Sequence, residues 1–249
     1  MKIIYFYICV IYNKIFSFIE NIFFLNKKIS KSSTLLSEGY ELHKLNKINF
    51  ILNPEKEIKL NNYITKYILK KEDIYKNLVS FFNNNNLKKI ITDKTGFEYS
   101  VDYIIYYTTF KIPDSQTNKD LYANKWHNDK PFTKNTLKII IPLNETENYN
   151  GGIEILNIQQ TKKFKNFFVQ YPEKYFTMKS KLNHILLFLP NLCLHKAGNP
   201  DIKEGRKQIM IQLNPSNKWC LNKKIYQKQF NIEPKFPIFN YMLDGKIKL

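Results

Sequence analysis

The chain has 249 residues, of which 43% are hydrophobic and 15% aromatic, enough for one domain with a sizeable core and no need of disulfide staples. Cys9, Cys193 and Cys220 are widely spaced and form no CxxC pair, which argues against a disulfide scaffold or a zinc finger and favours a cytoplasmic protein. The formal net charge is +18, but most basic residues are lysines scattered singly or in pairs, a composition bias that does not indicate a specific nucleic-acid partner.

The N-terminal segment, residues 1–30, is expected to form a hydrophobic helix ahead of a single domain over residues 31–249. Its first twelve residues are strongly apolar, but Lys14 and Glu20 interrupt the run, whereas a spanning helix needs about twenty apolar residues. No small-residue cleavage site for a secretory signal is present. Packing on the domain is the favoured role, and peripheral membrane contact through residues 1–25 and a signal-anchor are the alternatives.

Residues 28–60 mix polar residues with short apolar runs and are expected to be irregular. Residues 60–90 are expected to form a helix, because apolar side chains recur near the 3.6-residue period and the run stops at four asparagines. The members of that period are Ile64, Tyr67, Ile68, Ile74, Leu78 and Phe81.

From residue 99 onward the sequence consists of short runs rich in β-branched and aromatic residues, which predict strands. These runs are 99–110, 136–144, 152–156, 184–190, 192–198 and 207–214. A polar turn, "ETENYNGG", follows the second run, a helix or long loop is expected over 161–176, and the tail from Trp219 is expected to be irregular. Short strands with little helix between them predict an antiparallel sandwich or barrel, and thus a mostly β fold with flanking helices.

Three polar side chains in this region have the types and spacing of metal ligands. His127 and Asp129 are separated by one residue, so on an extended segment both side chains point to the same side. His195 ends a later predicted strand, and distant segments meet at one mouth of an antiparallel barrel. Two histidines and one carboxylate on one face of an ion form the facial triad of non-haem Fe(II) oxygenases.

An arginine follows at the start of the next predicted strand. Arg206 lies eleven residues after His195, in a chain that otherwise strongly prefers lysine. A planar, bidentate donor of this kind suits the far carboxylate of a dicarboxylate co-substrate such as 2-oxoglutarate. Strand alternation places Gln208, Met210 and Gln212 on the same face as Arg206.

With these residues, the segments "WHND", "TLKIIIPLNETENYNGGIEIL", "HILLFLPNLCLHKAGNP" and "EGRKQIMIQL" resemble the double-stranded β-helix (jelly-roll) core of the Fe(II)/2-oxoglutarate-dependent dioxygenases. The branch that they resemble is the phytanoyl-CoA dioxygenase-like one, over about residues 100–215. The resemblance implies that Fe(II) binds His127, Asp129 and His195, and that Arg206 binds 2-oxoglutarate.

The resemblance also implies a reaction: O₂ and 2-oxoglutarate are consumed, succinate and CO₂ are released, and a small organic substrate is hydroxylated. Halogenating relatives replace the carboxylate ligand with a small residue, so Asp129 favours hydroxylation. Thr136 and Lys138 share one face of a strand that is predicted to meet the cavity. Either of them, Gln208, and Tyr106 or its neighbour Tyr107 are candidates for contact with the co-substrate.

Two alternatives of other classes stay open. A cupin-like metal protein would use Glu154 as its carboxylate and need no 2-oxoglutarate. The second is a non-catalytic binding protein on the same barrel, with attachment to a membrane through residues 1–25 as one form of this alternative. A nucleic-acid-dealkylating dioxygenase is disfavoured because such enzymes typically carry a second arginine six residues after the first, where this chain has Gln212.

Overall fold

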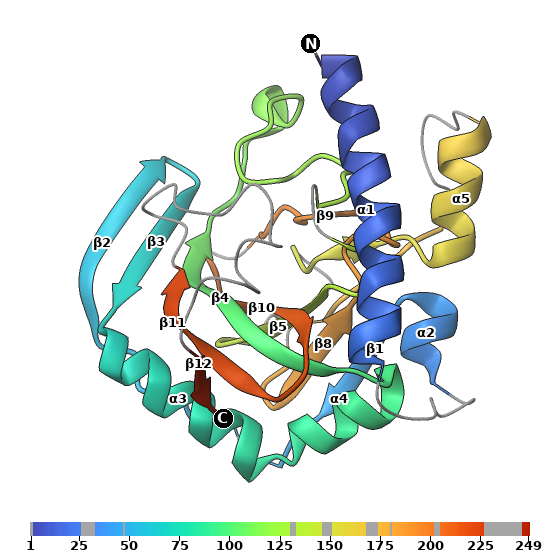
Figure 1. Ribbon diagram of the computed structural model, residues 1–249. Helices are drawn as coiled ribbons and strands as arrows, with labels where there is room; N and C mark the ends of the chain where they lie inside the picture. The colour runs from blue at the N-terminus through green and yellow to red at the C-terminus, as the bar shows by residue number, and fades with distance from the viewer. Residues whose placement is uncertain are drawn as a thin grey trace.

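The computed structural model describes residues 2–25, 33–46, 48–129, 133–145, 151–167, 174–179, 181–201, 205–226 and 246–249. Two β-sheets form the body of the protein, with helices at its periphery (Figure 1).

The larger sheet has nine strands and is almost entirely antiparallel. Its main path runs in the order β1 (Tyr40–Lys44), β8 (His184–Phe188), β5 (Leu137–Pro142), β10 (Arg206–Ser216), β4 (Glu98–Thr109), β11 (Cys220–Tyr226) and β12 (Lys246–Lys248). A hairpin of β2 (Pro54–Asn61) and β3 (Ile64–Leu69) joins it at the end of β4.

The smaller sheet has the order β7 (Phe176–Thr177), β6 (Glu154–Ile155) and β9 (His195–Lys196). At the edge of this sheet, His195 of β9 also forms an isolated antiparallel bridge with His127. The segment at His127 therefore pairs as a fourth strand of this sheet, opposite β8, β5, β10 and β4 of the larger one. Two mostly antiparallel sheets that face each other in this way, here with extra strands on the larger one, form a jelly roll, which confirms the predicted fold class.

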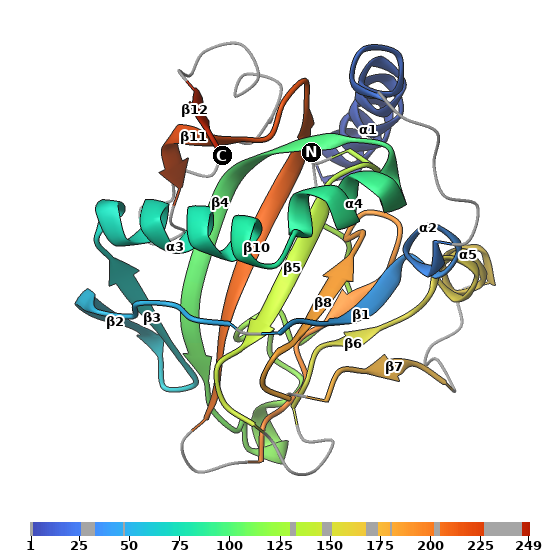
Figure 2. The ribbon, with the colours of Figure 1, turned by 90° about the horizontal axis from the view of Figure 1, so that it is seen from below.

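The main core lies between the larger sheet and two helices, α3 (Lys71–Asn84) and α4 (Leu87–Thr95), that cover its outer face (Figure 2). Along β10, Ile209, Ile211 and Leu213 are buried in this core. The alternate residues of β10 face the space between the sheets, because successive side chains of a strand point to opposite faces. One strand thus supplies both the core and the interior of the sandwich.

Three further helices lie outside the sandwich: α1 (Lys2–Phe24), α2 (Thr34–Glu38) and α5 (Ile158–Phe167), with a 3₁₀ turn at Asp114–Gln116. In the part of the chain that the structure describes, no helix combines the length and apolarity needed to cross a membrane.

The predicted helix over 60–90 is wrong in its first third. Ile64–Leu69 is a strand, and the helix starts at Lys71. Over so short a run, the apolar residues fit both the 3.6-residue period of a helix and the two-residue period of a strand. The pairing of β3 with β4 favours the strand. Its partner β2, expected to be irregular, is a mostly exposed and charged edge strand, so it lacks the hydrophobic alternation that marks strands.

The tail from Trp219 was also expected to be irregular, yet β11 and β12 add two strands to the larger sheet. The strand predicted over 192–198 is shorter in the structure, where β9 contains only two residues. Most of the predicted turn over 145–152 lies outside the described residues, as do residues 168–173 of the predicted insertion and residues 227–245 of the tail.

Candidate metal centre

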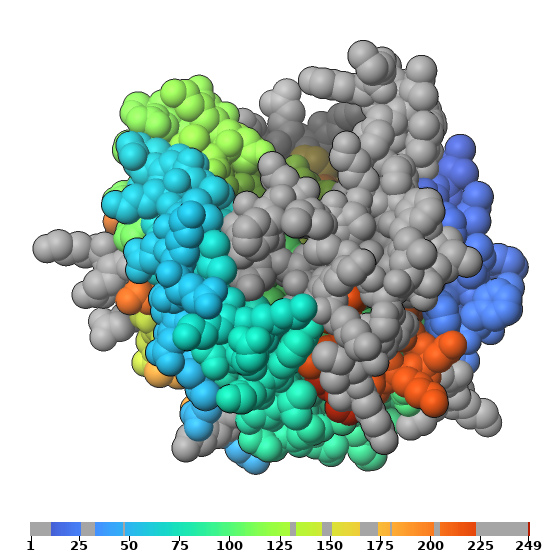
Figure 3. Space-filling view, turned by 60° about the vertical axis from the view of Figure 1, so that its left-hand side comes forward, coloured from blue at the N-terminus to red at the C-terminus, as the bar shows by residue number. Residues whose placement is uncertain are grey.

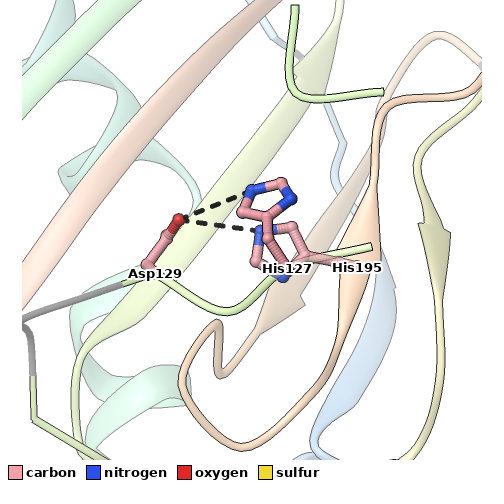
Figure 4. A group of neighbouring side chains, drawn as sticks. All are labelled: His127, Asp129 and His195. Carbon is pink, nitrogen blue, oxygen red and sulfur yellow. Dashed lines mark ion pairs between the residues drawn. The ribbon is translucent and has the colours of Figure 1, made fainter. Parts of the chain in front are cut away.

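The two histidines are brought together by backbone pairing. The His127 amide donates to the His195 carbonyl and the His195 amide donates to the His127 carbonyl, each at 3.0 Å. Directly opposed residues of an antiparallel pair carry their side chains on the same side of the sheet, and the two imidazole centroids lie 4.4 Å apart. Asp129, two residues after His127, turns its carboxylate toward both rings (Figure 4).

The three side chains converge on one point. Their ligating atoms lie within 4.8 Å of one another, and Asp129 Oδ1 is 3.8 Å from Nε2 of His127 and 3.8 Å from Nε2 of His195. The Nδ1 atoms are occupied elsewhere, at 2.7 Å from the Lys125 carbonyl and 3.1 Å from the Cys193 carbonyl. Because a carbonyl only accepts, each Nδ1 carries the proton, and each Nε2 presents its lone pair to the common point.

The second oxygen of Asp129 has its own partner. The Lys138 ammonium, on β5, forms a buried ion pair with Asp129 Oδ2. Burial alone would raise the pKa of Asp129, but Lys138 and the two imidazoles hold that pKa well below its usual range. Burial lowers the pKa of His195 to about 4, against the opposing effect of Asp129. At neutral pH the cluster therefore has an ionised carboxylate and a neutral His195, the states that bind a metal ion.

The cluster opens into a cavity of about 250 Å³ between the sheets. Arg206, at the start of β10, lines the same cavity with only 1% of its surface exposed. Among the described residues, its Nε and Nη1 have no hydrogen-bond partner. A buried cation with unsatisfied donors is costly, and an anion bound in the cavity could accept hydrogen bonds from this guanidinium.

The structure places most of the predicted site residues around this cavity. The members that line it are His127, Asp129, His195, Arg206, Lys138 and Gln208. Thr136 and Tyr106 do not line it: Thr136 is buried and donates to Asn214 Oδ1 at 3.0 Å, and Tyr106 stacks on Tyr67 with ring centroids 4.4 Å apart.

Tyr107 lines the cavity in place of its neighbour, and its hydroxyl accepts a hydrogen bond from the Gln208 amide. Two other polar residues line the cavity but were not predicted from the sequence, Lys66 and Tyr122. Lys66 was assigned to the predicted helix, and only the pairing of β3 with β4 brings it opposite Tyr107.

Glu154, the carboxylate of the cupin-like alternative, is outside the cluster. It forms an ion pair with Lys196 at 2.8 Å. Cys193 is buried against Gly39 rather than directed at the histidines, and His184 lies at the start of β8 with its Nδ1 3.2 Å from the Leu182 carbonyl.

Comparison with known proteins identifies the fold. No protein-family model matches the chain, and no curated protein matches it significantly in sequence. Among solved structures, the non-heme alpha ketoglutarate dependent epimerase SnoN from nogalamycin biosynthesis matches with a TM-score of 0.53 and 10% identity, over 73% of this chain and 79% of SnoN. EctD from S. alaskensis with bound Fe matches with a TM-score of 0.51 and 12% identity, over 86% of each chain. The chain thus has the jelly-roll fold of these structures, with a His-Asp-His cluster that can hold a metal ion between its sheets.

Proposed function

We propose that this protein is a non-haem Fe(II)- and 2-oxoglutarate-dependent oxygenase that oxidises a small organic substrate. The observation that carries the proposal is the presence, in one cavity, of a His-Asp-His cluster and a buried arginine with two donors that no described residue accepts. The fold likeness to SnoN and EctD, one named for its dependence on alpha ketoglutarate and the other solved with Fe, supports it.

His127, Asp129 and His195 would hold Fe(II) through two imidazole nitrogens and one carboxylate oxygen. This donor set suits iron and, placed on one face of the ion, leaves the opposite positions open. Lys138 occupies Asp129 Oδ2, so the carboxylate offers the metal a single oxygen. When bound, iron and 2-oxoglutarate supply the activation of dioxygen, with release of succinate and CO₂.

Arg206 would bind the far carboxylate of 2-oxoglutarate. Its Nε and Nη1, which have no hydrogen-bond partner in the described part of the chain, match the bidentate geometry that arginine adopts with carboxylates. Gln208 and Tyr107, joined by their own hydrogen bond, lie beside it on the cavity wall and orient the co-substrate.

The rest of the wall is apolar and would exclude water from the reacting atoms. The residues that form it include Ile105, Ile140, Ile153, Phe188 and Met210. A mostly apolar wall with a few convergent polar groups is the lining that small-molecule sites typically have. Asp129 fills the coordination position that a halide would need, which favours hydroxylation.

The cupin-like alternative is less well supported, because Glu154 is engaged by Lys196. A non-catalytic barrel is less favoured, because the candidate metal ligands and the buried Arg206 share one cavity, as the proposed reaction requires.

The test is anaerobic titration of Fe(II) and 2-oxoglutarate into the purified protein, with the visible metal-to-ligand charge-transfer band as readout. We expect the band in the wild type and its loss in His127→Ala and Asp129→Ala, with His184→Ala, a histidine outside the cluster, as the matched control. Succinate formation in air should follow the same pattern. A band that survives in His127→Ala would show that the ligand assignment is wrong.

A further inference from the structure

Asn128 lies between His127 and Asp129, the two candidate ligands that share one extended segment. Its side-chain Nδ2 donates to the Pro190 carbonyl at 3.0 Å and to the Cys193 carbonyl at 2.9 Å. Carbonyls only accept, so the amide nitrogen must face them, and both of its N–H donors are used. Because alternate residues of an extended segment point to opposite sides, Asn128 does not line the cavity that its two neighbours line.

The Cys193 carbonyl connects Asn128 to the third candidate ligand. The same oxygen lies 3.1 Å from Nδ1 of His195, the ring nitrogen that carries the proton. A carbonyl oxygen has two lone pairs, so it can accept from Asn128 and from His195 at once. The direction in which a histidine presents Nε2 to a metal is set by the bond that its Nδ1 makes. Asn128 therefore holds the acceptor that orients the His195 ring.

The segment that carries His127 and Asp129 has little backbone pairing of its own. It follows residues 113–125, most of which are exposed and which form the yellow-green lobe at the upper left of Figure 3. Within residues 126–129, His127 alone bonds through its backbone to the backbone of another described segment, in the bridge to His195. The two side-chain bonds of Asn128 add a second attachment, one residue away from Asp129.

The loop that accepts these two bonds is itself well fixed. The amides of Leu192 and Cys193 donate to the Leu189 carbonyl at 3.1 and 3.0 Å, and the Leu189 amide donates to the Gly39 carbonyl at 2.8 Å. The Cys193 side chain is fully buried, and a Cβ atom added at Gly39 would lie 2.2 Å from its Sγ. A carbonyl held in this way gives the groups that bond to it a fixed position.

We propose that Asn128 is a positioning residue of the metal centre. Its amide ties the segment of His127 and Asp129 to the loop that orients His195, and so places the three ligands relative to one another. The inference rests on the proposed function, in which these three residues hold a metal ion. An asparagine that only stabilised the loop would affect unfolding and leave the binding of the metal unchanged in the folded protein.

The test is the affinity of the full chain for Ni²⁺, measured by isothermal titration calorimetry in Asn128→Leu and Asn128→Ala. Both variants lack the donor but differ in bulk, so that either one decides the question if the other does not fold. We expect the affinity to fall about ten- to hundred-fold in each, the usual effect of removing a group that orients a metal ligand. In the Co²⁺-loaded variants the visible d–d absorption should also shift, because the ligands meet the ion at different angles.

Asn191→Leu is the matched control. Asn191 lies in the same loop, and its Nδ2 also donates to a carbonyl, that of Thr133, at 2.9 Å. This bond involves neither a candidate ligand nor the Cys193 carbonyl. We therefore expect Ni²⁺ affinity and the Co²⁺ spectrum to stay at their wild-type values in Asn191→Leu, even where its thermal unfolding is lowered as much as that of Asn128→Leu.

Wild-type Ni²⁺ affinity in a folded Asn128→Leu or Asn128→Ala protein would overturn the positioning role and leave the metal centre in place. An equal loss of affinity in Asn191→Leu would overturn it as well, since any weakening of the loop would then have the same effect. A wild type that does not bind Ni²⁺ would overturn the proposed metal centre, and the role of Asn128 with it.

Discussion

Arg206 holds a full positive charge almost out of contact with water, with two donors unused by the described residues. In Arg206→Met we expect 2-oxoglutarate affinity to fall thirty-fold or more, since charge-assisted hydrogen bonds contribute roughly 1.5 to 3 kcal/mol each. Without 2-oxoglutarate, the variant should be at least as stable as wild type, because an uncompensated buried charge has been removed. Titration of the charge-transfer band and denaturant unfolding check the two effects. Lys207→Met, on the opposite face of β10, is the control, and equal loss of affinity in both variants would contradict the role of Arg206.

Lys138 balances the charge of Asp129, the candidate carboxylate ligand, when no metal is bound. In Lys138→Met, Asp129 stays buried without a cation, which should destabilise the metal-free protein by about 3 kcal/mol. Adding Ni²⁺ should recover most of this loss, because the metal then supplies the missing positive charge. Thermal unfolding with and without Ni²⁺ checks the prediction. An equal loss of stability in both conditions would mean that Lys138 acts only by packing.

Four of the residues at this centre could be read from the sequence, because residue type and spacing are enough to mark His127, Asp129, His195 and Arg206. The surrounding residues could not be predicted, because successive residues of a strand point to opposite faces and the sequence does not show which face meets the cavity. Tyr106 and Tyr107 are neighbours in β4, and only the pairing of Tyr107 with Gln208 in the sheet shows which one faces the cavity.

The smaller sheet depends on two close backbone approaches. A Cβ atom at Gly152 would lie 1.7 Å from the Met178 carbonyl oxygen, and one at Gly198 would lie 2.2 Å from the Gly152 carbonyl oxygen. Side chains at these positions would therefore push β6 away from β7 and from the segment that follows β9. His195 lies in β9.

We expect Gly152→Ala to destabilise the protein by about 3 kcal/mol or more, through displacement of backbone rather than of a flexible side chain. Ni²⁺ affinity should fall with it, because His195 moves with the sheet. Ile155→Val, a conservative change three residues later in β6 that should cost about 1 kcal/mol, is the control for ordinary repacking. Wild-type Ni²⁺ affinity in a folded Gly152→Ala protein would show that the sheet tolerates the shift.

At the level of elements, the sequence predicts the strands that have strong hydrophobic runs, such as β4, β5, β8 and β10. It does not predict β2, whose exposed and charged residues look like a loop. It also assigns Ile64–Leu69 to a helix, because six residues are too few to distinguish the helical period from the strand period. The contact that makes this segment a strand is its pairing with β4, which is distant in the sequence.

For the whole molecule, occupancy of the cavity should stabilise the fold. A ligand present at 100 times its dissociation constant adds about 2.7 kcal/mol, which corresponds to a rise in Tm of roughly 5 to 10 °C for a domain of this size. Ni²⁺ alone should raise Tm, and 2-oxoglutarate should raise it further only when Ni²⁺ is present. Differential scanning fluorimetry after chelator treatment checks this order. An undiminished effect of 2-oxoglutarate on the metal-free protein would place its binding elsewhere.

The single bridge between His127 and His195 makes the candidate metal centre depend on correct assembly of the smaller sheet. Two of the three candidate ligands are aligned by one reciprocal pair of backbone bonds between segments that are remote along the chain. A nascent or damaged chain whose smaller layer has not closed would therefore offer no complete set of donors. Under the proposed function, capture of the ion would therefore report that the two layers have come together.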